Sequence, residues 1–228
     1  MDIKKYFNTT KKEIKSRKFN IFIGISLGNK WFTKENLQEY LNWALEHTKD
    51  KVLFLIADKI HSINYDVRNK KYSQKENLQR ALRNGKQIKG SLKNLLSEFS
   101  EKDRNKIKIL RWKNYKESDD FYKRYTPKVY EEFETNPKFK KQILNLVKKM
   151  IQDRKFSEED YLNFSKYLLK EFVASYSGIK YELNYYGMHI YPQESILHEF
   201  LEKLQQGKIF KELNKKLPKE KVAMVIIN

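Results

Sequence analysis

Cysteine is absent from the 228 residues of the sequence. Its absence excludes disulfide bonds, thiolate metal sites and cysteine nucleophiles. Histidine is scarce, and the four positions, His47, His61, His189 and His198, lack the spacing with carboxylates that a metal site requires. We therefore expect no metal ion.

Long hydrophobic runs are absent as well. The longest, residues 52–57, is far shorter than the roughly 20 residues needed to cross a bilayer. The basic first 18 residues contain no apolar core of the kind that marks a secretory signal. These two absences predict a cytoplasmic protein with no membrane span.

Acidic residues are few relative to basic ones. The sequence has 48 Lys and Arg against 29 Asp and Glu, a formal net charge of +19. Such an excess favours a polyanionic partner, above all nucleic acid, although a lysine-rich composition gives the same excess without any partner. Aromatic residues make up 14% of the chain, and together with compact apolar runs they indicate a folded protein.

Strand and helix patterns near the start of the chain predict a βαβ unit. An apolar strand covers residues 19–26, Thr33 begins an amphipathic helix, and a second apolar strand covers 51–58. Two strands joined by a helix within about 40 residues imply a parallel sheet. Residues 59–74 are polar and predict an irregular loop.

The same patterns along the rest of the chain predict an α/β protein. The expected elements are a helix over about 75–99, a strand over 106–112, helical or loop excursions over 113–156, a helix from Ser157 to about Ser175, a strand ending at 187–192, a helix over 195–206 and a final strand over 221–228. We predict a single Rossmann-like domain over residues 1–228, with a parallel sheet of about five strands flanked by helices. Residues 1–18 are expected as a basic N-terminal segment.

A serine between two glycines follows the first predicted strand. Residues 24–28 read Gly-Ile-Ser-Leu-Gly, which matches G-x-S-x-G. Flanking glycines allow a tight turn that presents the Ser26 hydroxyl to an electrophile. Ser26 is therefore a candidate nucleophile, and the alternative is an ordinary strand-to-loop turn with an incidental serine.

The order of elements argues against an α/β-hydrolase. In that fold the serine turn follows several strands, whereas Ser26 follows the first predicted one. His189 and His198 lie downstream, but no Asp is placed beside them to complete a triad. A serine esterase is therefore not favoured.

Tyr167 and Glu171 lie four residues apart on a predicted helix, so their side chains share a face. A phenol and a carboxylate in this arrangement are suited to hold an ammonium group. A surface glutamate beside a half-buried tyrosine has the same spacing. Tyr191, one of 15 tyrosines, carries little information alone.

In combination these features resemble the tRNA-dependent cyclodipeptide synthases. The stretch GISLGNKWF, the helix ending in NWALEH, the Tyr167–Glu171 pair and Tyr191 follow one another as in that family, with a basic helical segment between strands. The resemblance covers about residues 19–206. It implies a fold similar to the catalytic domains of class I aminoacyl-tRNA synthetases.

The resemblance also implies a ping-pong reaction on two aminoacyl-tRNAs. Ser26 takes up the first aminoacyl group, the second aminoacyl-tRNA yields a dipeptidyl-enzyme, and cyclisation releases a diketopiperazine. Tyr167 and Glu171 are expected to hold the first amino group, and Tyr191 to assist proton transfer. No ATP or other cofactor is needed, because the ester is already activated. The alternative is a non-catalytic, synthetase-like protein that binds tRNA or another RNA.

Residues near these motifs are expected to bind the substrate. By the resemblance, Phe22, Gly24, Ala174 and His189 line the pocket for the first aminoacyl group, and His189 there favours a polar or acidic side chain. Pro192 places the chain in the family branch with proline after the second tyrosine. Asn29 also belongs to the site, although an asparagine at that position is typical of the other branch.

A basic helix is the candidate tRNA-binding surface. The basic residues that we expect to bind phosphates are Arg80, Arg83, Lys86, Lys89 and Lys93, most of them on the side adjacent to the apolar one and Lys89 at the border. Such a row suits phosphates of an acceptor stem, although a solvated lysine-rich face has the same pattern. The partners we expect are two aminoacyl-tRNAs, and the protein is expected to act as a monomer.

Overall fold

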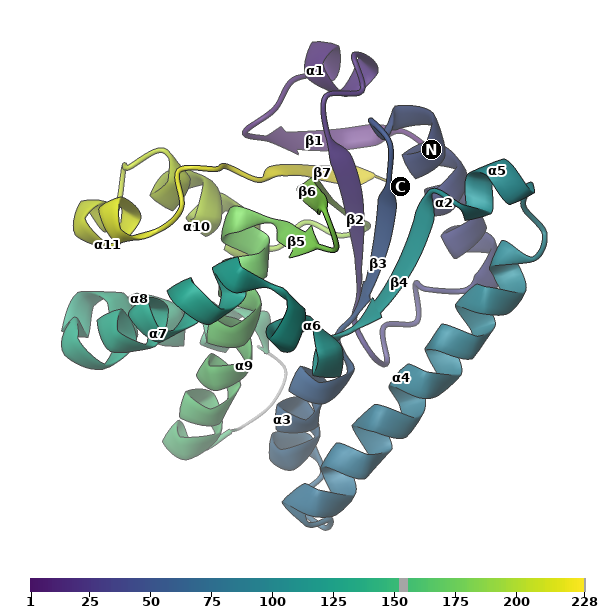
Figure 1. Ribbon diagram of the computed structural model, residues 1–228. Coiled ribbons are helices and arrows are strands. Elements are labelled where there is room, and N and C mark those ends of the chain that lie inside the picture. The colour runs from purple at the N-terminus through teal and green to yellow at the C-terminus, as the bar shows by residue number, and fades with distance from the viewer. Residues whose placement is uncertain (152–155, 228) are drawn as a thin grey trace.

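The computed structural model describes residues 1–151 and 156–227 (Figure 1), with the side chains of 116–118 excepted. The strands in these ranges are β1 (Ile3–Phe7), β2 (Asn20–Ile25), β3 (Val52–Ile56), β4 (Ile107–Arg111), β5 (Ile179–Tyr181), β6 (Asn184–Tyr191) and β7 (Ala223–Ile227). The helices are α1 (Lys11–Lys15), α2 (Lys34–His47), α3 (Asp58–Arg68), α4 (Gln74–Leu96), α5 (Glu101–Arg104), α6 (Trp112–Ser118), α7 (Asp120–Thr135), α8 (Pro137–Met150), α9 (Glu158–Ser177), α10 (Ile196–Gln205) and α11 (Lys211–Lys216).

All the strands join one mixed sheet in the order β1-β7-β6-β2-β3-β4, with β5 paired to β6. The five strands β7, β6, β2, β3 and β4 run parallel to one another. β1 pairs antiparallel with β7, and β5 pairs antiparallel with β6. The α/β prediction is confirmed, and its parallel sheet of about five strands corresponds to the parallel part of a larger, mixed sheet.

Successive side chains along the strands point to opposite faces of the sheet and divide the core into two layers. In β3, Leu53 and Leu55 belong to one hydrophobic cluster, whereas Phe54 and Ile56 belong to the other. The second cluster includes buried residues of α2 and α4, and the first includes those of α3 and of α6 to α11. Because successive strand residues point to opposite faces, both faces of β3 are buried under helices.

The first 18 residues form ordered elements that the sequence analysis did not anticipate. Ile3 of β1 pairs with Ile227 of β7 at the far end of the chain. The short helix α1 begins with a capping box between Thr10 and Glu13, and Ile14 is buried. The strand that leads to Ser26 is therefore the second in the chain, and it is not preceded by a mere tail.

The loop prediction for residues 59–74 is wrong, because most of this segment is helix α3. The helix buries Asp58, Ile60 and Val67 and leaves the other side chains at least partly exposed. Ile60, Ile63 and Val67 are the aliphatic residues of an otherwise largely polar segment, and the helix packs against α4 and α9.

Other helix boundaries follow the predicted signals. The Thr33 side chain accepts a hydrogen bond from the Asn36 amide at the start of α2, and Ser157 forms a capping box with Asp160 at the start of α9. The region predicted as helical or loop excursions contains α6, α7 and α8 in its described part, which ends at Ile151.

Candidate active site

The predicted nucleophile lies at the carboxyl end of β2, directly after Ile25. β2 pairs with β3 on one side and with β6 on the other, so the sheet order reverses at this strand. Ligands of open α/β sheets bind at such switch points, outside the carboxyl ends of the strands. Ser26 therefore occupies the position where this fold places a binding site.

Strand periodicity brings the second tyrosine to the serine. Phe22 of β2 is in register with His189 of β6, so Gly24 and Ser26 point to the same face as Tyr191. The hydroxyl oxygens of Ser26 and Tyr191 are 3.2 Å apart, within hydrogen-bond distance. Residues 165 positions apart in the sequence thus form a direct contact.

Helix α9 supplies the other two predicted catalytic residues. The Tyr167 hydroxyl donates a hydrogen bond of 2.6 Å to Oε1 of Glu171 one turn later. Ala174, two turns from Tyr167, lines the same cavity. The helical spacing therefore aims all three residues at the face of the sheet that carries Ser26.

The environment of these groups raises their pKa values. Burial raises the pKa of Glu171 to about 7, against the opposing effect of the Tyr167 hydrogen bond. Burial and the neighbouring Glu171 carboxylate raise the pKa of Tyr167 well above its usual range, while a hydrogen bond with Ser26 opposes the rise. Burial also raises the pKa of Tyr191. At neutral pH the two phenols are protonated and Glu171 exchanges a proton readily.

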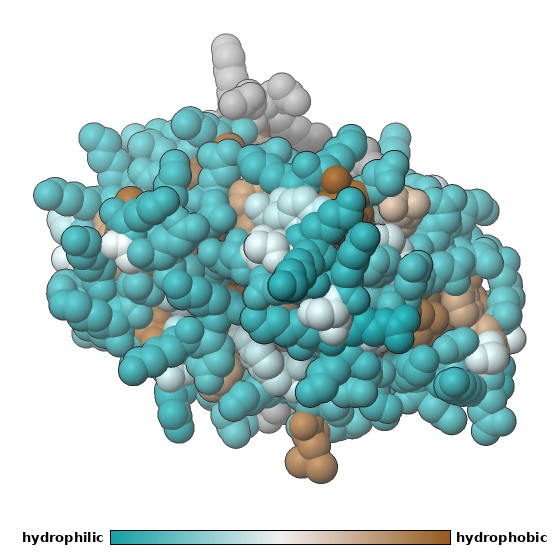
Figure 2. Space-filling model, turned by 90° about the horizontal axis from the view of Figure 1, so that it is seen from above, coloured by the Kyte–Doolittle hydropathy of each residue, from teal (hydrophilic) through white to brown (hydrophobic). Residues whose placement is uncertain are grey.

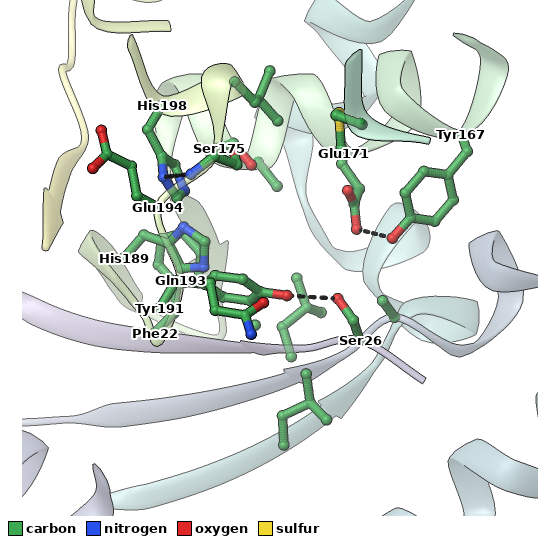
Figure 3. Close-up of a pocket in the computed structure, with 18 of the residues that line it drawn as sticks. Phe22, Ser26, Tyr167, Glu171, Ser175, His189, Tyr191, Gln193, Glu194 and His198 are labelled. Atoms are coloured by element: carbon green, nitrogen blue, oxygen red, sulfur yellow. Dashed lines mark hydrogen bonds between the residues drawn. The ribbon is translucent and has the colours of Figure 1, made fainter. Parts of the chain in front are cut away.

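These side chains line a cavity of about 490 Å³ (Figure 3). Of the predicted site residues, the cavity lining includes Phe22, Gly24, Ser26, Tyr167, Glu171, Ala174, His189 and Tyr191. Sequence positions predicted from separate motifs thus converge on one chamber. Its volume accommodates an amino-acid side chain together with the reacting ester.

Asn29 and Pro192 are not among the residues that line this cavity. The Asn29 side-chain oxygen accepts a hydrogen bond from the Trp31 amide, and a hydrogen bond with Asn29 opposes the rise in the pKa of Tyr191 that burial causes. Pro192 is buried next to Tyr191. Both residues therefore contact or adjoin the tyrosine and do not face the cavity.

His189 is held against the strand floor of the cavity. Its ring stacks on Phe22 with a centroid separation of 4.5 Å and an interplanar angle of 3°. A Cβ at Gly24 would lie 3.0 Å from the His189 Nε2 atom, so a glycine at this position leaves room for the ring. Gly24 thus serves the packing of His189 as well as the turn.

Several lining residues were missed by the sequence analysis. They include Lys149, Gln193, Glu194 and His198. His198 lies in the first turn of amphipathic α10, where its position resembles that of an ordinary core residue. Lys149 lies at the end of lysine-rich α8, a pattern typical of a solvated surface. No motif marks either residue, so their location depends on the tertiary structure.

The predicted basic residues differ in their accessibility. Arg83, Lys86 and Lys93 are exposed, whereas Lys89 is partly buried. The Arg80 guanidinium packs over the Tyr72 ring at 4.3 Å from its centroid and over the Tyr65 ring at 5.5 Å. Three of the predicted cations are thus accessible to phosphates, while Arg80 also joins α4 to α3 and to the residues before α4.

The surface is predominantly hydrophilic on the face shown in Figure 2. No helix in the described ranges is long and apolar enough to cross a membrane. Within the same ranges, no group of three or more His, Asp or Glu side chains is placed to hold a metal ion.

A histidine-activated serine is not present in the described part of the chain. The Ser26 hydroxyl lies within hydrogen-bond distance of Tyr191. Both ring nitrogens of His189, the histidine stacked on β2, are without a hydrogen-bond partner there. The site therefore lacks the Ser–His contact of a serine hydrolase.

Solved structures with the same fold are cyclodipeptide synthases. The chain is similar to such an enzyme from Staphylococcus haemolyticus, with 17% identity, 98% of each chain covered and a TM-score of 0.75. It is similar to one from Bacillus thermoamylovorans, with 17% identity, 95% and 93% coverage and a TM-score of 0.74. The chain is also similar to a Mycobacterium tuberculosis protein whose structure is described as demonstrating that cyclodipeptide synthetases are related to type I tRNA synthetases. The identity is 13%, the match covers 99% of this chain and 94% of that one, and the TM-score is 0.73.

Sequence comparison gives the family. No curated protein matches the chain. The family model described as cyclodipeptide synthase matches residues 5–173, which include Ser26, Tyr167 and Glu171, while Tyr191 lies beyond the match. The chain therefore belongs to the cyclodipeptide synthases, enzymes that use aminoacyl-tRNAs.

Proposed function

We propose that this enzyme joins two aminoacyl groups into a cyclic dipeptide through an ester on Ser26. The observation that carries the proposal is the convergence of the Ser26–Tyr191 contact and the Tyr167–Glu171 pair on one cavity. A hydroxyl, two protonated phenols and a carboxyl with a pKa near 7 provide a nucleophile, proton donors and a base.

In the first step the Ser26 oxygen attacks the ester carbonyl carbon of an aminoacyl-tRNA. The bond to the ribose oxygen breaks, the serine proton passes to that oxygen, and free tRNA leaves. Tyr191, 3.2 Å from Ser26, is placed to relay this proton. The product is an aminoacyl ester on Ser26.

Glu171 and Tyr167 hold the α-amino group of the bound residue. The Glu171 carboxylate pairs with the ammonium form and then accepts its proton, which a pKa of about 7 permits at neutral pH. The free amine attacks the ester carbonyl carbon of the second aminoacyl-tRNA, the bond to the ribose oxygen breaks, the amine proton passes to that oxygen, and the second tRNA leaves. The new terminal amine then attacks the Ser26 ester, which closes the ring and regenerates the serine hydroxyl.

The test is product formation by the purified protein. Incubation with aminoacyl-tRNAs is expected to yield diketopiperazines in a mass spectrum, and Ser26→Ala is expected to reduce the yield at least about 1000-fold. Ser16→Ala, at an exposed serine before β2, is the matched control. Equal yields from the wild type and Ser26→Ala contradict the proposal.

The non-catalytic RNA-binding alternative is not favoured. A protein that only binds RNA has no need of a cavity in which a serine, two tyrosines and a carboxyl converge. The exposed cations of α4 fit either function, because an enzyme for aminoacyl-tRNA must also bind RNA.

We propose further that the enzyme acts as a monomer in the cytoplasm, with the exposed cations of α4 and their neighbours Arg80 and Lys89 as its tRNA surface. One chain supplies the serine, both tyrosines and the carboxyl group of the proposed mechanism, and aminoacyl-tRNAs are cytoplasmic substrates. Light scattering during size-exclusion chromatography is expected to give a mass near 27.7 kDa. A dimer's mass at every protein concentration tested would contradict the proposed monomer.

A further inference from the structure

Two buried histidines lie on the side of the cavity away from Tyr167 and Glu171 (Figure 3). His189 is only 9% exposed, and neither of its ring nitrogens has a hydrogen-bond partner among the described residues. A buried polar atom without a partner destabilises the folded protein, because it has lost its hydrogen bonds to water. Native structures do not tolerate many such groups, so the free nitrogens of His189 require an explanation.

His198 offers a donor of defined orientation beside His189. The two ring centroids are 6.4 Å apart, and His198 is 5% exposed. Its Nδ1 atom accepts a hydrogen bond from the Ser195 amide at 3.2 Å. Because Nδ1 is the acceptor, the neutral ring carries its proton on Nε2, which is therefore a donor.

The His189 ring is fixed before any ligand binds. The parallel stack on Phe22 restrains it on one side, and the missing side chain of Gly24 gives its Nε2 atom space. A restrained ring loses little freedom on binding, so its hydrogen bonds discriminate strongly between ligands.

The charges around the pair favour an uncharged ligand. Burial lowers the pKa of His189 to about 3 and that of His198 to about 4, so both rings are neutral. Glu194, which also lines the cavity, is paired with Lys5, and Lys149 is exposed. Because neither ring is charged, a charged group at the histidines would gain no counter-charge from them, and burying an unpaired charge is costly.

We infer that His189 and His198 form a subsite for the side chain of a substrate amino acid that carries an uncharged hydrogen-bonding group. Together the two neutral rings present two donors and one acceptor. A carboxamide, which has an acceptor oxygen and a donor nitrogen, complements this set best, and a hydroxyl or neutral imidazole complements it in part. The inference rests on the proposed function, since the substrate reaches the subsite as an aminoacyl group.

The experiment supplies the purified enzyme with tRNA charged with all amino acids and identifies both the acyl group on Ser26 and the diketopiperazines. Wild type is expected to incorporate a residue with an amide, hydroxyl or imidazole side chain. His189→Leu is expected to shift the ratio of polar to aliphatic incorporation at least about 10-fold toward aliphatic residues, because a site built for hydrogen bonds rejects ligands that lack them.

Two further variants separate recognition from folding. His189→Gln retains a donor and an acceptor and is expected to restore part of the polar preference. His47→Leu alters a histidine that stacks on Trp43 outside the cavity, and it is expected to leave the ratio unchanged. The wild-type profile is decisive even if His189→Leu does not fold.

The outcomes distinguish a failure of the subsite from a failure of the proposed function. Wild-type products with only aliphatic, phenylalanyl or charged side chains overturn the subsite, as does an unchanged ratio in folded His189→Leu, while the proposed function stands. Absence of any acyl group on Ser26 of the wild type overturns the proposed function, and the subsite with it.

Discussion

At the scale of single residues, the central feature is a carboxyl group withdrawn from water beside a phenol. Glu171 receives a hydrogen bond from Tyr167, yet burial raises its pKa to about 7. A carboxyl that titrates near neutral pH is able to bind an ammonium group and then take its proton. In the proposed mechanism, the position of Glu171 therefore serves catalysis at a cost in stability.

The titration of Glu171 predicts a pH dependence. In the proposed mechanism the ionised form binds the substrate ammonium group, so kcat/KM for ester formation on Ser26 is expected to fall about tenfold per pH unit below about pH 7. Glu171→Gln is expected to lose about 100-fold or more in kcat/KM and to lack this pH dependence. Quenched-flow measurements from about pH 5.5 to 7.5 provide the test, and an equal slope in both proteins contradicts the assignment.

The raised pKa of Glu171 also predicts that rising pH, which favours catalysis, destabilises the folded protein. The folded protein holds the Glu171 proton up to about pH 7, whereas the unfolded chain releases it near 4.5, so this group makes the protein less stable as the pH rises between these values. Glu171→Gln is expected to be more stable than wild type above about pH 7, by on the order of 1 kcal/mol after solvent screening. Chemical denaturation at about pH 4.5 and about pH 7.5 measures the difference, which is expected to vanish at the lower pH.

At the scale of elements, helix α4 illustrates how a residue that weakens a helix is required by its packing. Gly85 is buried against Asp58, the first residue of α3. Asp58 is fully buried and accepts a 2.5 Å hydrogen bond from Arg111 Nε, so it is not free to move away. Two helices and strand β4 therefore meet at a position where only a glycine fits.

A pair of alanine substitutions tests this packing. A Cβ at Gly85 would lie 2.4 Å from the Asp58 Cβ atom, so Gly85→Ala is expected to reduce the free energy of unfolding by about 2 to 3 kcal/mol. A Cβ at Gly90 would meet no neighbour within 4 Å, so Gly90→Ala is expected to add up to about 1 kcal/mol. Urea denaturation compares the two, and equal effects would contradict the account.

The elements also show what sequence alone predicts. The β2–α2–β3 unit was predicted because its strands are continuous apolar runs and Thr33 marks the helix start. Helix α3 was missed because few of its residues are buried, and β1 because its partner, β7, lies at the opposite end of the chain. Long-range pairing and tertiary packing leave no local pattern in the sequence.

The candidate site, like the fold, could be predicted only in part from local sequence patterns. Spacing on a helix placed Tyr167 and Glu171 on one face, but only the sheet register shows that Tyr191 meets Ser26. The family resemblance supplied what the spacing did not, namely that these residues belong to one site. His198 was missed because it follows no motif and reaches the cavity from the first turn of α10, where it resembles an ordinary core residue.

At the scale of the whole molecule, the net charge of +19 favours a polyanionic substrate, and α4 concentrates part of it. Phosphate contacts release counterions, so binding weakens as salt is added. The helix carries exposed cations on the side opposite its buried residues Ala81 and Leu92. The active site lies at the carboxyl ends of the strands, and Figure 1 shows α4 extending past that end of the sheet.

Replacing Arg83, Lys86 and Lys93 together by alanine is therefore expected to weaken aminoacyl-tRNA binding and to reduce the slope of log K against log salt concentration by about 2 to 3. Arg80 is left in place because it packs over Tyr72. The control triple variant replaces three exposed lysines in or between α10 and α11, namely Lys203, Lys208 and Lys211. These helices lie on the other side of the molecule from α4 in Figure 1. Fluorescence anisotropy over a range of salt concentrations measures both slopes, and equal slopes in the two variants place the tRNA elsewhere.

The most direct measurement is the mass of the enzyme after a brief incubation with a single aminoacyl-tRNA and an acid quench. The account predicts one added aminoacyl mass, released by mild base and located by peptide mapping at Ser26, and no added mass on Ser26→Ala. An unmodified wild-type protein that nevertheless makes diketopiperazine, or an ester at another residue, would contradict it.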